Sequence, residues 1–443
     1  MSLPRGMSRR RFLAGAARLA AGLLAGSPPA SIAPLRARAQ AEPLRVAYVG
    51  PVRTGISPVS AATYQVAGEA ARKGAIMAGE EFSGIAEMLG RRFEVLTASA
   101  PTPAAAVRAA ARLMAREGVY GILGGFDPEG CSALADLAEQ RGALFLNIGC
   151  ASDALRHEGC RRHTFHVEAS AAMYLDAVAD WFVRQGARRW FFVTPDAPEG
   201  RARLERARHA LAQRHWGGRE AGNASVAPGE PEYRPVLEQI REAKPDLVLL
   251  LLDGVGQLDF LGQYEEAGLP HRVTGFPEAV AQTRTFFAAA RTSAPRTGTG
   301  YRATLWEATL DNYGGRELNA RFLERWGQPM DPPAWAAWAS VKILWEAASF
   351  AGTTDPGQLA AYLEGEATLF DVYKGIGVSF RPWDHQLRET VFLVKVQEDA
   401  SDPLGLAALV GQLPAISRPG FSPNEMLDQI GDAADRSGCS FTG

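Results

Sequence analysis

The sequence predicts an α/β protein built from two doubly wound parallel sheets. The clearest evidence lies in residues 118–155, where two short apolar runs, Val119–Leu123 and Ala143–Ile148, flank a segment of helical spacing, Cys131–Gln140. Buried parallel strands read as continuous apolar runs of this kind. Strand, helix and strand in this order form a βαβ unit, and the same alternation continues on both sides of it.

The elements before this unit follow the same alternation. Thr102 or Pro103 begins a helix and Gly118 ends it, because threonine and proline favour helix starts and glycine favours the residue after the end. Gly142 stands at the corresponding place after the next helix. The predicted elements are strand Leu44–Gly50, helix Thr63–Gly79, strand Arg92–Thr97 and helix Thr102–Glu117.

After residue 155 the alternation resumes, so we expect a second lobe of the same architecture. Its elements recur in type and not in sequence, which excludes a solenoid. Residues 165–168 read as an extended link, and residues 278–300 are poorly patterned. The predicted elements are a helix capped by Ser170 and running to Gln185, strand Trp190–Thr194, helix Glu199–His215, helix Tyr233–Ala243, strand Asp246–Leu252, helix Val255–Ala267 and strand His271–Phe276.

The remaining chain predicts three more helices, a strand and a hairpin. From Asp399 onward the pattern fades, and residues 401–443 are expected to form a loosely packed tail. The predicted elements are strand Tyr301–Trp306, helix Glu317–Trp326, helix Pro332–Phe350, helix Asp355–Glu364, and a β-hairpin of Val372–Phe380 with Glu389–Val396.

Residues 1–39 read as a twin-arginine signal peptide. Ser8-Arg9-Arg10-Arg11-Phe12-Leu13 precedes a weakly apolar run, and Ala37-Arg38-Ala39 offers a small-x-small cleavage site. A basic tail or a membrane anchor is the alternative. Cleavage takes away seven of 47 basic residues and none of the 49 acidic ones, which moves the net charge from −2 to −9. A nucleic-acid partner is therefore disfavoured, and a soluble periplasmic protein is expected.

The four cysteines lie in the part that would reach an oxidising compartment. Cys150 and Cys160 flank a short loop and are the preferred disulfide, although Cys131 remains open as a partner. Neither CxxC nor HxxxH spacing occurs, so no metal site is expected. The sequence also lacks Gly-x-Ser-x-Gly, HExxH and P-loop motifs, which disfavours a hydrolytic enzyme.

The order of elements resembles the type I periplasmic binding proteins of ABC transporters, of the leucine/isoleucine/valine-binding type. The features that carry the resemblance are LRVAYVGP, GVYGILGG, LFLNIGCASDAL, PDLVLLLL and GIGVSFRPWDHQLRETVFLV, spread over residues 44–400. The resemblance implies two lobes joined by a hinge of three crossings. One lobe comprises residues 44–165 plus 305–355, and the other comprises residues 166–304 plus 356–400.

A narrower resemblance concerns SDALRHEGCRRHTFHVEAS, AWAAWASVKILWEA and FRPWDHQLR, which are similar to binding proteins encoded beside PQQ-dependent alcohol dehydrogenase systems. The family resemblance implies a monomeric, non-enzymatic receptor without a cofactor. It would capture an amino acid or a related small organic acid and deliver it to an ABC transporter permease. A periplasmic sensor linked to PQQ-dependent alcohol oxidation is the alternative function.

Ligands of open parallel sheets gather at the carboxyl ends of the strands, which points to the loops Gly124–Glu129 and Gly149–Leu155. The family places its ligand contacts at such loops in both lobes. Ser152 matches the family's Thr/Ser position, whereas Phe126 and Asp127 replace a serine-containing loop. Carried over by position, the implied ligand-binding residues are Arg53, Phe126, Asp127, Cys150, Ala151, Ser152, Pro195, Asp196, Asp253 and Phe276.

Several of these residues have an equally simple structural interpretation. Asp127 directly before a helix could be its N-cap, and Asp253 could end its strand in an Asp-Gly turn. As ligand contacts, acids here would repel a carboxylate unless an amine or a cation accompanied it, whereas Phe126 could stack on an apolar group. Cys131 at a helix start could have a lowered pKa. The tryptophans of residues 335–345 are expected in the core.

Overall fold

The computed structural model describes residues 42–52, 63–214, 217–229, 232–415 and 420–441. Within them the strands form three sheets. The first sheet has the order β2-β1-β3-β4-β5 and the second the order β7-β6-β8-β9, and all their pairs are parallel. The third, β10-β11-β12, is antiparallel. The prediction of two parallel sheets in an α/β protein is confirmed.

The first sheet begins its winding at β1, from which the chain steps first to one side and then to the other. α2 starts and stops where the sequence predicts, because Thr102 accepts a hydrogen bond from the N–H of Ala105, and Gly118 adopts φ +64°. α1 continues to Met88, beyond its predicted end at Gly79, and α3 begins at Pro128, before its predicted start at Cys131. The elements are β1 (Leu44–Gly50), α1 (Tyr64–Met88), β2 (Phe93–Ser99), α2 (Pro103–Glu117), β3 (Gly121–Gly124), α3 (Pro128–Arg141), β4 (Leu144–Asn147) and β5 (Thr164–His166).

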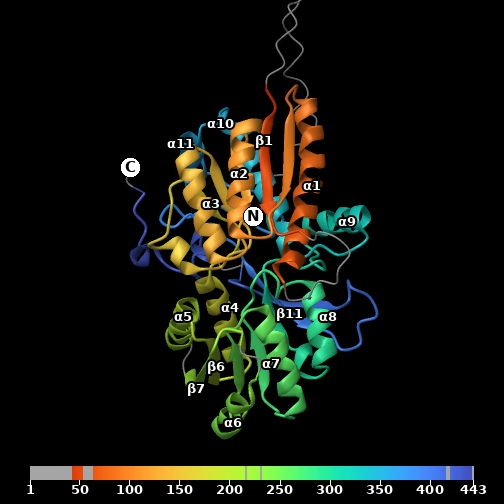
Figure 1. The fold of residues 1–443 in the computed structure, drawn as a ribbon, viewed down its shortest axis with the longest axis vertical. Helices are drawn as coiled ribbons and strands as arrows, with labels where there is room; N and C mark the ends of the chain where they lie inside the picture. Colours follow the sequence, from red (N-terminus) through yellow and green to blue (C-terminus); the bar gives the residue numbers. More distant parts are fainter. Residues whose placement is uncertain (1–41, 53–62, 215–216, 230–231, 416–419, 442–443) are drawn as a thin grey trace, which may run out of the picture. The chain divides into compact units, whose positions relative to one another are not determined.

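The second sheet repeats this winding over four strands. Figure 1 draws α1, α2 and α3 around β1, and α4, α5, α6 and α7 around the strands β6 and β7. The elements are α4 (Ala171–Arg184), β6 (Arg189–Pro195), α5 (Pro198–Arg214), β7 (Arg219–Val226), α6 (Arg234–Ala243), β8 (Leu247–Leu250), α7 (Gly254–Glu266), β9 (Arg272–Gly275) and α8 (Arg284–Ser293). β7 and α8 were not expected, and the expected link at residues 165–168 contains most of β5.

The predicted hairpin of Val372–Phe380 with Glu389–Val396 is wrong. Its second arm is β11, which pairs with β10 and β12 instead, and its first arm makes only isolated bridges, Phe370 to Val378 and Phe380 to Leu387. The remaining elements are β10 (Tyr301–Thr304), α9 (Gly315–Trp326), α10 (Pro332–Ala351), α11 (Pro356–Leu363), β11 (Val391–Val396), β12 (Ala407–Leu413) and α12 (Pro423–Leu427).

The C-terminal segment is packed rather than loose. β12 completes the third sheet, and Leu427 and Ile430 are buried. Asp428 accepts from the guanidinium groups of Arg381 and Arg388 at 2.8 and 2.9 Å. These two arginines belong to the segment that was predicted to be a hairpin, so ion pairs with the C-terminal segment hold it where strand pairing does not.

The predicted Cys150–Cys160 disulfide is also wrong. Cys160 is bonded to Cys439, 279 residues further along the chain, with 5.8 Å between the Cα atoms. Cys150 is buried at the end of β4, where the side chain of Asn147 bonds both its N–H and its carbonyl oxygen. Those bonds hold Cys150 in the interior. Cys160 is only partly buried, and the C-terminal segment that carries Cys439 lies against it.

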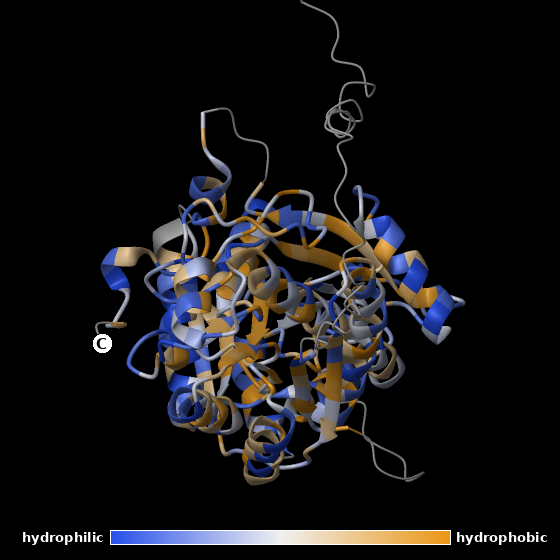
Figure 2. Cartoon of the chain, turned by 90° about the horizontal axis from the view of Figure 1, so that it is seen from above, coloured by the Kyte–Doolittle hydropathy of each residue, from blue (hydrophilic) through white to orange (hydrophobic). Residues whose placement is uncertain are grey.

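The core contains the predicted tryptophans of α10. Trp335 and Trp338 are almost fully buried, and Trp335 stacks on Trp306 with 5.5 Å between ring centroids. Figure 2 shows hydrophobic strands in the interior of the view, with hydrophilic turns on the helices outside them. Among the described residues, no helix combines the length and apolar character that crossing a membrane requires.

The contact between α1 and α10 depends on a glycine. A Cβ on Gly74 would overlap the carbonyl oxygen of Ala334, whereas a Cβ on Gly84, in the same helix, would meet nothing within 4 Å. We therefore expect Gly74→Ala to lower the free energy of unfolding by about 1–3 kcal/mol. Gly84→Ala should raise it by about 0.5–1 kcal/mol, because alanine restricts the unfolded chain. Urea unfolding of both variants measures these changes. Equal changes in the free energy of unfolding would contradict a close contact between Gly74 and α10.

Candidate functional site

The loops that leave β3 and β4 run side by side at the carboxyl edge of the first sheet. β3 and β4 are paired with Gly124 opposite Asn147. Phe126 follows β3 and is only 4% exposed, and a Cβ on Gly149, in the neighbouring loop, would meet its ring. The aromatic ring is therefore part of the wall between these two loops.

Asp127 is the N-cap of α3. Its Oδ1 accepts a hydrogen bond of 2.7 Å from the N–H of Gly130, which confirms the structural interpretation of this residue. The charge of Glu278 and burial raise the pKa of Tyr64 at the start of α1, and the Asp127 carboxylate adds to this shift. Tyr64, Thr102, Phe126 and Asp127 are among the residues that line a cavity of about 70 Å³.

Cys150, Ala151 and Ser152 form the loop after β4. The loop is rigid because Arg156 donates to the carbonyl oxygens of Cys150 and Ser152, at 3.3 and 2.8 Å, and the carbonyl of Ala151 accepts from Ala171 at 2.7 Å. Ser152 is buried at 2% exposure. Its hydroxyl donates to Glu199 at 3.1 Å, and Glu199 lies in the first turn of α5, directly after β6 of the second sheet.

On the side of the second sheet, Arg203 is the central residue. Its guanidinium lies 4.3 Å from the centre of the Phe276 ring, and Phe276 immediately follows β9. It forms an ion pair with Glu278 at 2.9 Å and lies 3.5 Å from Glu199. Burial raises the pKa of Glu278, and the charge of Arg203 opposes the shift. The negative charge of Glu278 in turn raises the pKa of Tyr64.

The structure thus gathers Ser152 and Phe276 of the predicted residues around three that were not predicted: Glu199, Arg203 and Glu278. Phe126 lies beside Tyr64 at the edge of the first sheet. Glu199 and Arg203 lie one turn apart at the start of the helix that follows β6. This position was the signal available in the sequence, because a helix that follows a strand places its first turn at the carboxyl edge of the sheet.

The other predicted residues are less involved. Asp196 is exposed and bonded to Arg201 at 2.8 Å. Asp253 is an exposed N-cap whose carboxylate accepts from Gly256 at 2.8 Å, although its charge contributes to the raised pKa of Glu278. Pro195 ends β6, and Arg53 lies outside the described residues.

The side chains gathered here differ in chemical character. They comprise two aromatic rings, one hydroxyl, one guanidinium and two carboxylates, groups of the kind that bind apolar, anionic and cationic parts of a small molecule. The Ser152 hydroxyl contacts a carboxylate and not a histidine. In the part of the chain that the structure describes, no group of three or more His, Cys, Asp or Glu side chains is placed to hold a metal ion.

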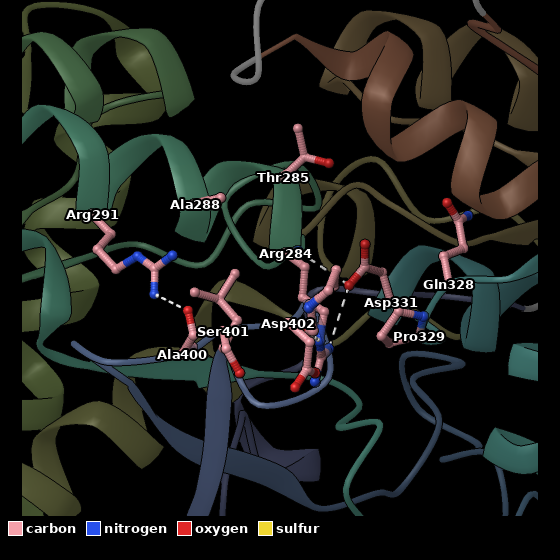
Figure 3. A pocket seen from close by; sticks show the side chains of 12 residues that line it. Arg284, Thr285, Ala288, Arg291, Gln328, Pro329, Asp331, Ala400, Ser401 and Asp402 are labelled. Atoms are coloured by element: carbon pink, nitrogen blue, oxygen red, sulfur yellow. Dashed lines mark hydrogen bonds and ion pairs between the residues drawn. The ribbon is translucent and has the colours of Figure 1, made fainter.

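A second cavity, of about 380 Å³, lies between α8, the segment before α10, and the loop of residues 400–406 (Figure 3). None of the predicted residues lines it. The donors of Arg284 are engaged there, at 2.5 Å with Glu307 and 2.8 Å with the carbonyl of Pro403, and Asp331 lies at 3.5 Å. Arg284 thus joins three segments.

A family model described as periplasmic binding protein matches residues 52–401. The chain belongs to the periplasmic binding protein family. This match covers the second parallel sheet, every strand of the first except β1, and the loops of the site. Among curated proteins, none matches the chain.

Solved structures show the same fold for this periplasmic binding protein. An amino-acid ABC transporter substrate-binding protein from Pseudomonas fluorescens Pf-5 superposes with a TM-score of 0.73 at 20% identity, over 90% of this chain and 99% of its own. A branched-chain amino acid ABC transporter ligand-binding protein from Burkholderia xenovorans gives 0.72 at 19%, over 83% and 95%. An ABC transporter solute-binding protein from Rhodopseudomonas palustris, in complex with 3,4-dihydroxybenzoic acid, gives 0.67 at 18%, over 86% and 99%.

Proposed function

We propose that this protein captures a small organic solute between the carboxyl edges of its two parallel sheets and delivers it to the permease of an ABC transporter. The hydrogen bond from Ser152 to Glu199 supports this most directly, because it joins a loop of the first sheet to a helix of the second. A solute at this point would contact both sheets at once. Binding would then favour a closed arrangement of two lobes over an open one.

The proposed solute is an amino acid or an aromatic acid. Arg203 suits a carboxylate, Glu199 and Glu278 suit an ammonium group, and the rings of Phe126 and Phe276 suit an apolar or aromatic side chain. The related amino-acid ABC transporter substrate-binding protein and the complex with 3,4-dihydroxybenzoic acid agree with this range. We propose further that the chain acts as a monomer without catalysis, and that residues 1–39 export it through the twin-arginine pathway to the periplasm.

The lobe boundaries at residues 165–166, 304–305 and 355–356 and the association with PQQ-dependent alcohol oxidation remain predictions. Deletion of the gene distinguishes a transport protein from a sensor. Deletion should abolish uptake of the solute if the protein serves a transporter. Loss of a transcriptional response with unchanged uptake would identify a sensor.

Thermal unfolding in the presence of candidate solutes tests the proposed function. The probes are leucine, isoleucine, valine, benzoate and 3,4-dihydroxybenzoate. A solute present at a hundred times its Kd should stabilise the protein by about 2.7 kcal/mol. Recovery of the unchanged solute by mass spectrometry is expected. A chemically converted solute would instead show an enzyme.

Arg203→Gln should weaken binding of a carboxylate-bearing solute about tenfold, because the amide removes the cation between the two carboxylates. Arg201→Gln is the matched control. It lies two residues earlier in α5, where its side chain is 60% exposed and bonded to Asp196. Calorimetric titration of both variants measures the difference. If the two variants bind equally well, or if Arg203→Gln binds the carboxylate more tightly, Arg203 does not contact the solute.

A further inference from the structure

The last residues of the chain contact elements that belong to both parallel sheets. Residues 428–441 follow α12 and form a C-terminal strap, whose first residue, Asp428, pairs with Arg381 and Arg388. Further along, the strap contacts the loop between β4 and β5 of the first sheet. It also contacts α4 and α5, the helices before and after β6 of the second sheet. The C-terminal strap therefore spans the two halves that the proposed function separates and closes.

A disulfide and two hydrogen bonds attach the C-terminal strap to the loop after β4. Cys439 is bonded to Cys160, and the N–H of Gly438 donates to Nδ1 of His157 at 3.3 Å. Because Nδ1 accepts this bond, the neutral imidazole carries its proton on Nε2, which lies 3.1 Å from a carboxylate oxygen of Asp432. The covalent bond keeps this end of the strap with the first sheet when the second sheet moves.

On the side of the second sheet, noncovalent bonds hold the C-terminal strap. The N–H of Gly431 donates to Asp176 of α4 at 2.9 Å, and the carboxylate of Asp432 lies 3.7 Å from the guanidinium of Arg206 in α5. Arg206 in turn pairs with Asp176 at 2.9 Å, and these two side chains are 11% and 1% exposed. Electrostatic interactions between groups this buried are stronger than those in water.

Asp432 is the residue at which the two attachments meet. One of its carboxylate oxygens faces His157, and the other faces Arg206. Burial opposes the shift, but the hydrogen bond from His157 and the charge of Arg206 lower the pKa of Asp432, so it is a carboxylate at neutral pH. The backbone before it is fixed, because Gly431 has φ +88° and a Cβ there would overlap the guanidinium of Arg381.

We propose that the C-terminal strap is a clasp that resists separation of the two lobes, with the Cys160–Cys439 disulfide as its fixed end. This inference rests on the proposed function, because it concerns the opening of the same site. When the lobes separate, the covalent end stays with the loop after β4, so the bonds to α4 and α5 must break. Without the disulfide, the far end of the strap could follow α4 and α5, and those bonds would no longer oppose opening.

The effect of losing the disulfide is partial. Ser437 still donates to the carbonyl oxygen of Trp383 at 2.6 Å, and the ring of Phe441 stacks on His385 with 3.9 Å between ring centroids. These contacts keep the end of the strap near the loop after β4. They are noncovalent, so they can break when the lobes open, whereas the disulfide cannot.

The elements that the clasp joins are also the elements of the candidate site. Ser152 precedes Cys160 in the loop between β4 and β5, and its hydroxyl donates to Glu199 of α5 at 3.1 Å. Arg206, which faces the strap, lies one turn after Arg203 in the same helix. Release of a solute requires the separation that the clasp opposes, so the clasp should slow dissociation of the solute.

The first test is the distance between two spin labels in the full-length protein, measured by double electron–electron resonance after dialysis has removed retained solute. Arg108→Cys in α2 and Glu242→Cys in α6 place the labels at exposed positions beside the first and the second sheet. The native thiols, Cys131 and Cys150, are buried and do not compete for the label. Burial raises the pKa of Cys131, contrary to the expectation of a lowered value.

Two changes loosen the clasp in different ways. Cys160→Ser combined with Cys439→Ser removes the fixed end, and Asp432→Asn removes the charge that faces Arg206 while the disulfide stays. We expect both to show a population of longer label distances that is smaller or absent in the wild type. Asp435→Asn, at an exposed position of the same strap, is the matched control and should give the wild-type distances.

Wild-type label distances in both loosened variants would overturn the proposal. Asp432→Asn alone decides the test if the variant without the disulfide fails to fold. The labels report on folded protein without solute, so they test the clasp even if no solute binds and the proposed function fails.

Solute binding gives the second test. For a solute that thermal unfolding identifies, dissociation from both loosened variants should be roughly three- to tenfold faster than from the wild type, because the closed form is less favoured. Stopped-flow fluorescence measures the rates. Unchanged dissociation together with unchanged label distances would overturn the clasp and leave the proposed function intact.

Discussion

We expect Lys374→Met to lower the free energy of unfolding by about 3–5 kcal/mol, the largest effect of any variant considered for this protein. Lys374 and Glu389 form an ion pair of 2.6 Å in which both side chains are 0% exposed. Methionine fills the space of the lysine but leaves the Glu389 carboxylate buried without its partner. Burial already raises the pKa of Glu389 to about 7 against the attraction of Lys374, which shows how poorly the site solvates a charge.

A second substitution separates the charge from the packing. Lys374→Met combined with Glu389→Leu should recover much of the lost stability, because no unpaired charge remains in the core. Recovery should be incomplete, since Lys374 also donates to the carbonyl of Thr390 at 2.8 Å. Arg241→Met, which breaks an exposed ion pair with Glu238, should leave the urea midpoint nearly unchanged. A double variant as unstable as the single one would show that lost packing, and not charge, dominates.

We expect stability to fall between pH 5 and 8, and Glu168→Gln to remove a large part of that fall. Glu168 lies between β5 and α4, accepts from Tyr174 at 2.7 Å, and contacts Gln282 at 3.3 Å. Burial raises its pKa from 4.5 to about 8. The folded state therefore keeps a proton that the unfolded state releases above pH 4.5, so rising pH favours unfolding. The effect is on the order of 3 kcal/mol over this range.

Unfolding curves of wild type and Glu168→Gln at several pH values measure the contribution of Glu168 as the difference between their free energies of unfolding. The difference is needed because other buried acids act in the same direction: burial raises the pKa of Asp153 and of Asp331 to about 6. Glutamine can still accept from Tyr174, so its hydrogen bond is preserved. Glu238→Gln, at an exposed position, should follow the wild type at every pH. Parallel curves for wild type and Glu168→Gln would show that Glu168 is ionised throughout the range.

The sequence predicted those elements in which the apolar pattern and the capping residues indicate the same boundaries. β1 matches its predicted range, and α2 differs from its prediction by one residue, because apolar runs, Thr102 and Gly118 all indicate the same boundaries. β7 escaped prediction because Arg219–Val226 is polar, glycine-containing and only partly buried. The hairpin was predicted from alternation alone, whereas the segment that connects its two arms is held by Arg381 and Arg388, which donate to Asp428, contacts that no local pattern encodes.

Residues of the candidate site were predicted where they directly follow a strand, and they were missed where they lie in the helix after it. Phe126 and Ser152 come directly after β3 and β4, so their place at the sheet edge follows from the topology. Glu199 and Arg203 lie in a helix whose polar sequence predicts a solvent-exposed element. In the folded protein the start of this helix lies against Phe276. The Cys160–Cys439 disulfide joins residues 279 positions apart, a distance over which spacing carries no information.

The most direct test of the proposed function is a crystal structure of the protein with the solute that it retains from the periplasm. We expect this solute to lie between the two parallel sheets, within hydrogen-bonding distance of Ser152 and Arg203 and against the ring of Phe276. A solute in the cavity beside Arg284 (Figure 3), or one that touches a single sheet, would contradict it.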